Sequence, residues 1–174
     1  GMVAMHYAAR HPGGISKLIL SSTAAQFRLD ETMKMMRKLG GPRAADVARE
    51  FFSNPSKAAY ETYGQVCLPL YSNPNVPAAG AFRDRAIERP EVAFHFFSDE
   101  MAQMDMRAEI ANITCPTLVI GGAIDPVTPP ICSKAIADAI GDNARLRMFE
   151  GCGHGPHRDD PTGAEKIMRH FLAD

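Results

Sequence analysis

Apolar positions along the chain follow two patterns, short continuous runs and longer stretches with helical spacing. Three runs, residues 16–23, 116–121 and 144–149, are typical of short strands. The second is apolar throughout, as expected for a strand covered on both faces, whereas Arg145 and Arg147 alternate with apolar residues in the third. We therefore predict a sheet of about three strands, with residues 144–149 at a half-exposed edge.

Helical spacing predicts helices around these strands. Residues 2–10 form one that stops at a His-Pro-Gly-Gly sequence, residues 131–140 form one that ends at Gly141, and a last one starts at Asp160 and Pro161. A helix between the second and third strands makes a βαβ unit, in which the strands run parallel. The order helix, strand, insertion, strand, helix, strand, helix predicts an α/β fold class with a short parallel sheet flanked by helices.

A long insertion, residues 24–107, separates the first two strands and carries helical periodicity with no convincing strand. Asp30 can cap a helix that ends before Gly40, a second helix lies around residues 47–52, and a third around residues 59–67. We therefore expect two units: a core made of residues 1–23 and 108–174, and an all-helical cap made of residues 24–107.

Composition excludes several classes of partner. Nineteen Lys and Arg residues against twenty Asp and Glu give a net charge of −1, without a block of like charges. This balance predicts no nucleic-acid partner and no attraction to an anionic membrane. No apolar run approaches the roughly 20 residues of a membrane helix, no signal peptide is evident, and the four scattered cysteines are typical of reduced thiols. We expect a cytoplasmic protein.

Two residues that can do chemistry follow neighbouring strands. Asp125 comes directly after the second strand, and His154 comes after the third, between two glycines that allow a sharp turn. The carboxyl ends of parallel strands are where active sites gather, so a carboxylate and an imidazole there favour a working pair. The alternatives are that Asp125, which precedes a proline, only shapes a turn, and that His154 is only solvated.

These segments resemble a known family. The sequence ITCPTLVIGG at residues 113–122, followed by Asp125 and then by GCGHGP at residues 151–156, resembles the C-terminal half of α/β-hydrolases. In the insertion, CLPLY at residues 67–71 and FFSDEM at residues 96–101 resemble the proline iminopeptidase-like group. The resemblance implies that Asp125 orients His154, that His154 is the general base and acid, and that Glu100 meets the free amine of a substrate. The alternative for Glu100 is a solvated helix charge.

The same resemblance places a serine nucleophile in a Gly-x-Ser-x-Gly turn a few residues before Met2, and the chain contains no such motif. Loss of the nucleophile costs on the order of 10⁶ in turnover, so we expect a truncated serine hydrolase for esters or amides that is inactive by itself. A substitute nucleophile from Cys152, Ser21 or Ser22 is the less favoured alternative. No cofactor and no metal are implied.

Two other hypotheses stay open. A hydrolase remnant can act as a non-catalytic binding protein, and the open strand that starts at Lys17 and ends at Ser22 then predicts a homodimer joined through this edge. The third hypothesis is a metal-binding module, because potential ligands gather within nine positions, although their spacing matches no recognised zinc pattern. The ligands are Cys152, His154, His157, Asp159 and Asp160. No residue fixes the small-molecule ester or amide that would be the substrate.

Overall fold

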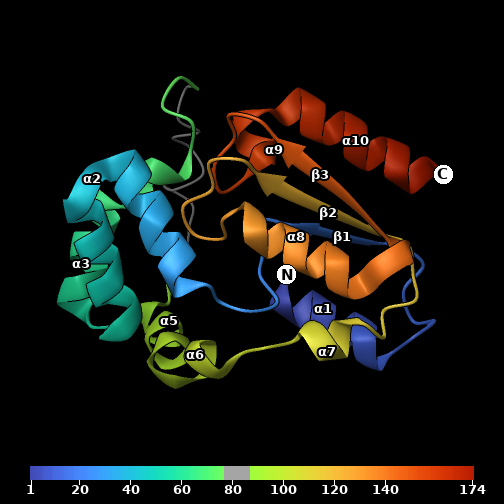
Figure 1. Ribbon diagram of the computed structural model, residues 1–174, viewed down its shortest axis with the longest axis horizontal. Coiled ribbons are helices and arrows are strands. Elements are labelled where there is room, and N and C mark those ends of the chain that lie inside the picture. Colours follow the sequence, from blue (N-terminus) through green and yellow to red (C-terminus); the bar gives the residue numbers. More distant parts are fainter. Residues whose placement is uncertain (77–86) are drawn as a thin grey trace.

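The sheet and its helices are arranged in a computed structural model that describes residues 1–76 and 87–174 (Figure 1). Residues 77–86, which belong to the insertion, lie outside the described residues. In chain order the elements are α1 (Met2–Arg10), β1 (Leu18–Ser21), α2 (Leu29–Ser53), α3 (Lys57–Val66), η1 (Leu68–Tyr71), α5 (Pro90–His95), η2 (Phe96–Glu100), α6 (Met101–Gln103), α7 (Arg107–Ile110), β2 (Thr117–Gly122), α8 (Pro130–Ile140), η3 (Gly141–Asn143), β3 (Ala144–Phe149), α9 (Pro156–Asp159) and α10 (Pro161–Ala173).

The three strands form one parallel sheet in the order β1-β2-β3, which confirms the predicted fold class. All six residues of β2 are buried, whereas half-buried and exposed positions alternate along β3 and only its last residue, Phe149, is buried. The first strand is shorter than residues 16–23 because Ser22 adopts a left-handed backbone conformation, with φ of 47°, and turns the chain out of the sheet.

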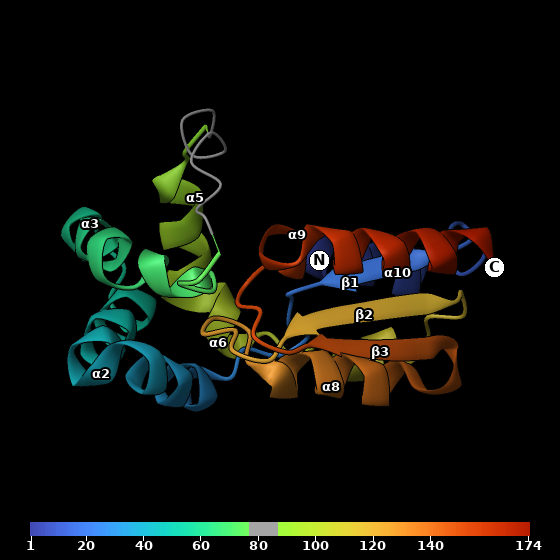
Figure 2. The ribbon, with the colours of Figure 1, turned by 90° about the horizontal axis from the view of Figure 1, so that it is seen from above.

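Helices cover both faces of the sheet, and α8 and α10 lie on opposite sides of it (Figure 2). Helices α1 and α8 pack on the face formed by Leu18, Leu20 and Val119. Helix α10 packs on the other face, against Leu118 and Ile120. The continuous apolar pattern of β2 is therefore the direct consequence of its two covered faces.

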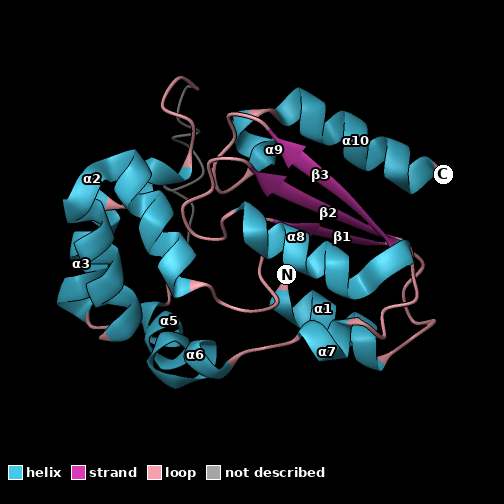
Figure 3. Cartoon of the chain, in the orientation of Figure 1, coloured by secondary structure: helices cyan, strands magenta, loops and turns pink. Residues whose placement is uncertain are grey.

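The insertion has its own apolar core, rich in aromatic and Met side chains, and its helices lie to one side of the sheet (Figure 3). Helix α2 contains a kink at Gly41, whose φ is 75°, followed by Pro42, so it corresponds to the two successive helices that the sequence predicts. The expectation that Asp30 caps this helix is wrong. The cap residue is Arg28, and Asp30 lies in the first turn, where its negative charge still favours the helix dipole.

The two ends of the insertion meet. Gln26 and Asp105 form an isolated antiparallel bridge, and the amide of Met106 donates to the carbonyl of Ala25 at 2.8 Å. The insertion thus leaves and rejoins the sheet-containing part at a narrow neck. Across residues 1–76 and 87–174, none of the helices combines the length and apolar character that crossing a bilayer requires.

Candidate active site

Asp125 lies in the turn after β2, and its side chain is fully buried. Its Oδ1 accepts hydrogen bonds from the amides of Val127 at 2.8 Å and Thr128 at 2.9 Å, and its Oδ2 accepts one from the Thr128 hydroxyl at 2.9 Å. The aspartate therefore shapes the turn, which is the alternative role that the sequence suggests for Asp125. These three donors also compensate for the loss of water contacts that burial imposes on a carboxylate.

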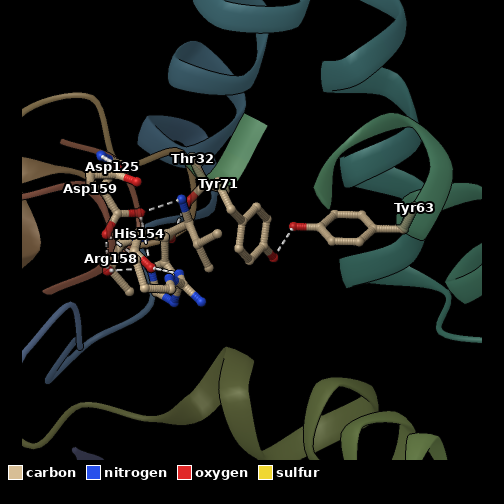
Figure 4. A network of polar contacts seen from close by, with 10 residues as sticks. Thr32, Tyr63, Tyr71, Asp125, His154, Arg158 and Asp159 are labelled. Carbon is tan, nitrogen blue, oxygen red and sulfur yellow. Dashed lines mark hydrogen bonds and ion pairs between the residues drawn. The ribbon is translucent and has the colours of Figure 1, made fainter. Parts of the chain in front are cut away.

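His154 lies directly against this carboxylate (Figure 4). Its Nδ1 is 2.9 Å from Oδ2 and 3.1 Å from Oδ1 of Asp125, and its side chain is 25% exposed. An Nδ1–H that donates to Asp125 leaves Nε2 as the atom that can accept a proton. The structure thus brings together the two residues that the sequence singles out, in the arrangement that general acid–base chemistry requires.

The loop that carries His154 can be built only with a glycine before it. A Cβ on Gly153 would overlap the carbonyl oxygen of Tyr71, which belongs to the insertion. The amide of Gly153 donates to Asp159 Oδ2 at 2.7 Å, and the guanidinium of Arg158 donates to the carbonyl of His154. The glycines noted in the sequence therefore allow a close backbone approach that fixes the histidine loop.

Three consecutive residues of the insertion, which we call the latch, run from Tyr71 to Asn73 and hold this loop. The carbonyl of Tyr71 accepts from the amide of His154 at 2.6 Å, and the two rings meet edge to face with centroids 5.2 Å apart. The side-chain amide of Asn73 donates to the carbonyl of Gly151 at 2.7 Å, and its backbone amide donates to Asp159 at 3.0 Å. Tyr71 belongs to the CLPLY motif, which predicts no role for it in the site, and no sequence pattern points to Asn73.

The insertion also supports the two loops indirectly. The Tyr71 hydroxyl forms a 2.7 Å hydrogen bond with the Tyr63 hydroxyl, and burial raises the pKa of both phenols well above the usual range. On α2, the hydroxyl of Thr32 donates to the carbonyl of Val127 at 3.0 Å, next to Asp125. Both the acid and the base are therefore positioned by contacts from the insertion as well as by the sheet.

A cavity of about 250 Å³ opens beside the imidazole of His154. Thr128 lines it together with residues from the end of β1 and the start of α1, and the insertion contributes aromatic and Met side chains to its wall. The lining residues are Gly1, Met2, Ser21, Ser22, Thr23, Ala24, Phe27, Phe52, Phe96, Phe97, Met101, Met104, Val127, Thr128 and His154. This is the space in which a reacting group can meet His154.

The other candidates differ in position. Glu100 lies outside the cavity lining, with a side chain 61% exposed and 3.3 Å from Nε2 of His95. Cys152 is buried, and burial raises the pKa of its thiol, which disfavours the reactive thiolate. Ser21 and Ser22 line the cavity, and within the described residues the buried Ser22 hydroxyl has no hydrogen-bond partner.

The part of the chain that the structure describes contains no group of three His, Cys, Asp or Glu side chains placed to hold a metal ion. Asp159 accepts from the amides of Asn73 and Gly153, and Asp160 caps α10 by accepting from the amide of Gly163 at 2.9 Å. These two carboxylates therefore accept hydrogen bonds from backbone amides of the latch, the histidine loop and α10.

Comparison with known proteins places this site in a family. Residues 1–161 match the family described as serine aminopeptidase, S33. The chain is 29% identical over 166 residues to a pimeloyl-[acyl-carrier protein] methyl ester esterase of Chromobacterium violaceum, covering 90% of this chain and 60% of the relative. It is 27% identical over 180 residues to a proline iminopeptidase of Pestalotiopsis fici, covering 99% of this chain and 63% of the relative.

The fold is also that of solved α/β-hydrolase structures. A proline iminopeptidase from Mycobacterium smegmatis superposes with a TM-score of 0.67 at 21% identity, covering 99% of this chain and 61% of that one. The chain thus spans about three fifths of the length of the relatives it matches. The family match over residues 1–161 and the shared fold lead to one conclusion: the chain belongs to the serine aminopeptidase S33 family of α/β-hydrolases.

Proposed function

We propose that Asp125 and His154 are the acid and base of an ester- or amide-cleaving serine hydrolase, and that residues 1–174 lack the nucleophile and are inactive alone. The observation that carries the proposal is the contact between His154 Nδ1 and the buried Asp125 carboxylate, beside a cavity that His154 itself lines. One relative is named a methyl ester esterase and another a proline iminopeptidase, and both ester and amide cleavage use this kind of pair.

In the proposed reaction His154 Nε2 takes the proton of a serine hydroxyl as the serine oxygen forms a bond to the substrate carbonyl carbon. The tetrahedral intermediate then collapses, the bond to the leaving oxygen or nitrogen breaks, and His154 returns the proton to that atom. Water then attacks the acyl group: His154 takes a proton from the water and returns it to the serine oxygen as the acyl–serine bond breaks. The carboxylic acid is released. Asp125 stabilises the imidazolium that forms in each half of the reaction and does not itself become protonated.

The start of α1 supports a particular position for the nucleophile. Gly1 and Met2 line the cavity together with His154, and among the described residues no side chain caps the first amides of α1. A serine just before Gly1 in a longer chain would therefore lie beside His154, and the helix N-terminus would favour the negative oxygen of the intermediate.

The experiment compares hydrolysis of p-nitrophenyl acetate and proline p-nitroanilide by residues 1–174 and by the same chain extended with the residues encoded upstream of Gly1. We expect background rates from residues 1–174 and turnover from the extended protein. In the extended protein, His154→Ala and Asp125→Asn should each lower turnover by about 10⁴ or more. His157→Ala changes an exposed histidine on the neighbouring α9, is the matched control and should retain activity.

Two results would contradict this proposal. Activity of residues 1–174 that disappears in His154→Ala would mean that Ser21, Ser22 or Cys152 is the nucleophile. An extended, folded protein that hydrolyses neither substrate would mean that the pair of residues is not catalytic.

A second candidate function is a non-catalytic, self-associating binding protein. It is favoured by the open side of β1, which among the described residues pairs with β2 and with no other strand, and by the exposure of Val3 and Tyr7 on the adjacent α1. This candidate and the enzymatic one are separated by the turnover assay above.

A further inference from the structure

The lining of the cavity beside His154 is of two chemical kinds. Ser21, Thr23, Thr128 and His154 offer hydroxyl and imidazole groups. The insertion supplies an apolar wall made of Phe52, Phe96, Phe97, Met101 and Met104. The rings of Phe52 and Phe97 meet edge to face at 5.2 Å, so this wall is a packed surface rather than a set of separate side chains.

No charged side chain is found among the described residues that line this cavity. Asp125 lies behind His154 and is already occupied by three donors and by the imidazole. Glu100, the residue expected to meet a substrate amine, lies elsewhere and is paired with His95. A cationic group placed against this wall would therefore lose its water and find no counter-ion, only the faces of aromatic rings, to replace it.

The volume limits the size of the group that the wall can cover. An apolar cavity of about 150 Å³ holds a benzene ring, so by scaling about 250 Å³ holds on the order of six to ten carbon atoms. Met2, Met101 and Met104 are unbranched and polarisable, and they adapt to linear as well as ring-shaped groups.

We propose that this cavity selects uncharged, apolar esters of about six to ten carbon atoms and rejects substrates that carry a free amine, in contrast to the aminopeptidase activity for which the family is described. The assignment of the bound group as a substrate rests on the proposed function, whereas the selectivity of the cavity can be measured without catalysis. Residues 1–174 are expected not to hydrolyse the probe, so the probe stays intact during the measurement.

The experiment is a titration of residues 1–174, labelled with ¹³C at the Met methyl groups and acetylated at Gly1 so that the amino terminus adds no charge. The probes are methyl hexanoate and methyl 6-aminohexanoate, which differ only in the terminal ammonium group. Methyl hexanoate should shift the methyl resonances of Met101 and Met104 but not that of Met168, which lies on α10 and packs against the cluster that contains Leu118 and Ile120. The amino ester should bind at least tenfold more weakly.

A variant that gains binding cannot be explained by unfolding of the chain. Met104→Glu places a carboxylate in the half-buried wall and should reverse the preference, so that the amino ester binds more tightly than methyl hexanoate. Met35→Glu makes the same change at a half-buried Met on α2 outside this cavity and should leave the wild-type preference intact.

Equal binding of the two esters by the wild-type chain would overturn the proposal. Shifts of the Met168 methyl resonance in place of those of Met101 and Met104 would also overturn it. Absence of binding by both esters would overturn it as well. None of these outcomes depends on the nucleophile, so the selectivity can fail while the enzymatic proposal stands. The enzymatic proposal can equally fail, through inactivity of the extended protein, while the selectivity stands.

Discussion

Thr128 is the residue that ties the acid and the base together. Its hydroxyl donates to Asp125 Oδ2 at 2.9 Å and lies 3.4 Å from His154 Nδ1, and the residue is buried. A hydrogen bond to a buried carboxylate contributes more than one between neutral groups, because the carboxylate has few other ways to replace its water.

We therefore expect Thr128→Val, which keeps the shape of the side chain, to lower the free energy of unfolding by about 1.5–3 kcal/mol. Thr62→Val is the control, because the Thr62 hydroxyl bonds to the carbonyl of Ala58 on the exposed surface of α3 and should change stability by less than about 0.5 kcal/mol. Urea denaturation followed by circular dichroism measures both. Equal effects of the two changes would mean that the hydroxyl of Thr128 does not support the carboxylate.

At the scale of elements, the hydrogen bond between the Tyr63 and Tyr71 hydroxyls joins α3 to η1, whose last residue, Tyr71, begins the latch. Removing one hydroxyl leaves its partner buried and unpaired, whereas removing both leaves an apolar contact of similar shape. Tyr63→Phe and Tyr71→Phe should therefore each cost about 1–3 kcal/mol, and the double variant should cost clearly less than their sum. A double-mutant cycle in urea measures this coupling, and simple additivity would show that the two hydroxyls act independently.

The same pair predicts how stability depends on alkaline pH. Burial raises the pKa of Tyr63 and Tyr71 above the usual value of about 10, so the unfolded chain loses these protons at a lower pH than the folded chain. Their contribution to stability is complete below about pH 10 and is lost as the pH rises further. The double Phe variant should unfold at a higher pH than the wild type in an alkaline titration of circular dichroism. Coincident titrations would contradict this.

Elements with a local cause could be predicted from the sequence. The strands around β2, helix α8 and the Asp160 cap of α10 each depend on residues that are close in the chain, and so does the placement of Asp125 and His154 at strand ends. The latch could not be predicted, because its contact between Tyr71 and His154 depends on how the insertion folds back on the sheet. The role of Gly153 follows from this same contact.

At the scale of the whole molecule, residues 1–76 and 87–174 leave one side of β1 unpaired and, on the neighbouring α1, expose Val3 at 84% and Tyr7 at 50%. A free strand edge beside exposed apolar groups favours pairing with a second chain. We therefore propose a two-fold dimer of this chain through residues 17–22.

Light scattering across a dilution series should show dimers of residues 1–174, and the Val3→Lys/Tyr7→Lys double variant should be dissociated at concentrations where the wild type is dimeric. Val92→Lys alters an exposed Val on α5 and should leave the dimer intact. A monomeric mass at every concentration would rule out the dimer. If a preceding strand occupies this edge in the extended protein, that protein should be monomeric.

The neck between Gln26 and Asp105 has a consequence for how such a molecule can diversify. An insertion whose two ends lie side by side can be replaced by another of different length without moving the scaffold, since closing a longer loop adds little entropic cost. A chimera that exchanges this segment among relatives is therefore compatible with the sheet. The histidine loop of the chimera is held in place, however, only if the exchanged segment also contains a counterpart of the Tyr71 carbonyl and of Asn73.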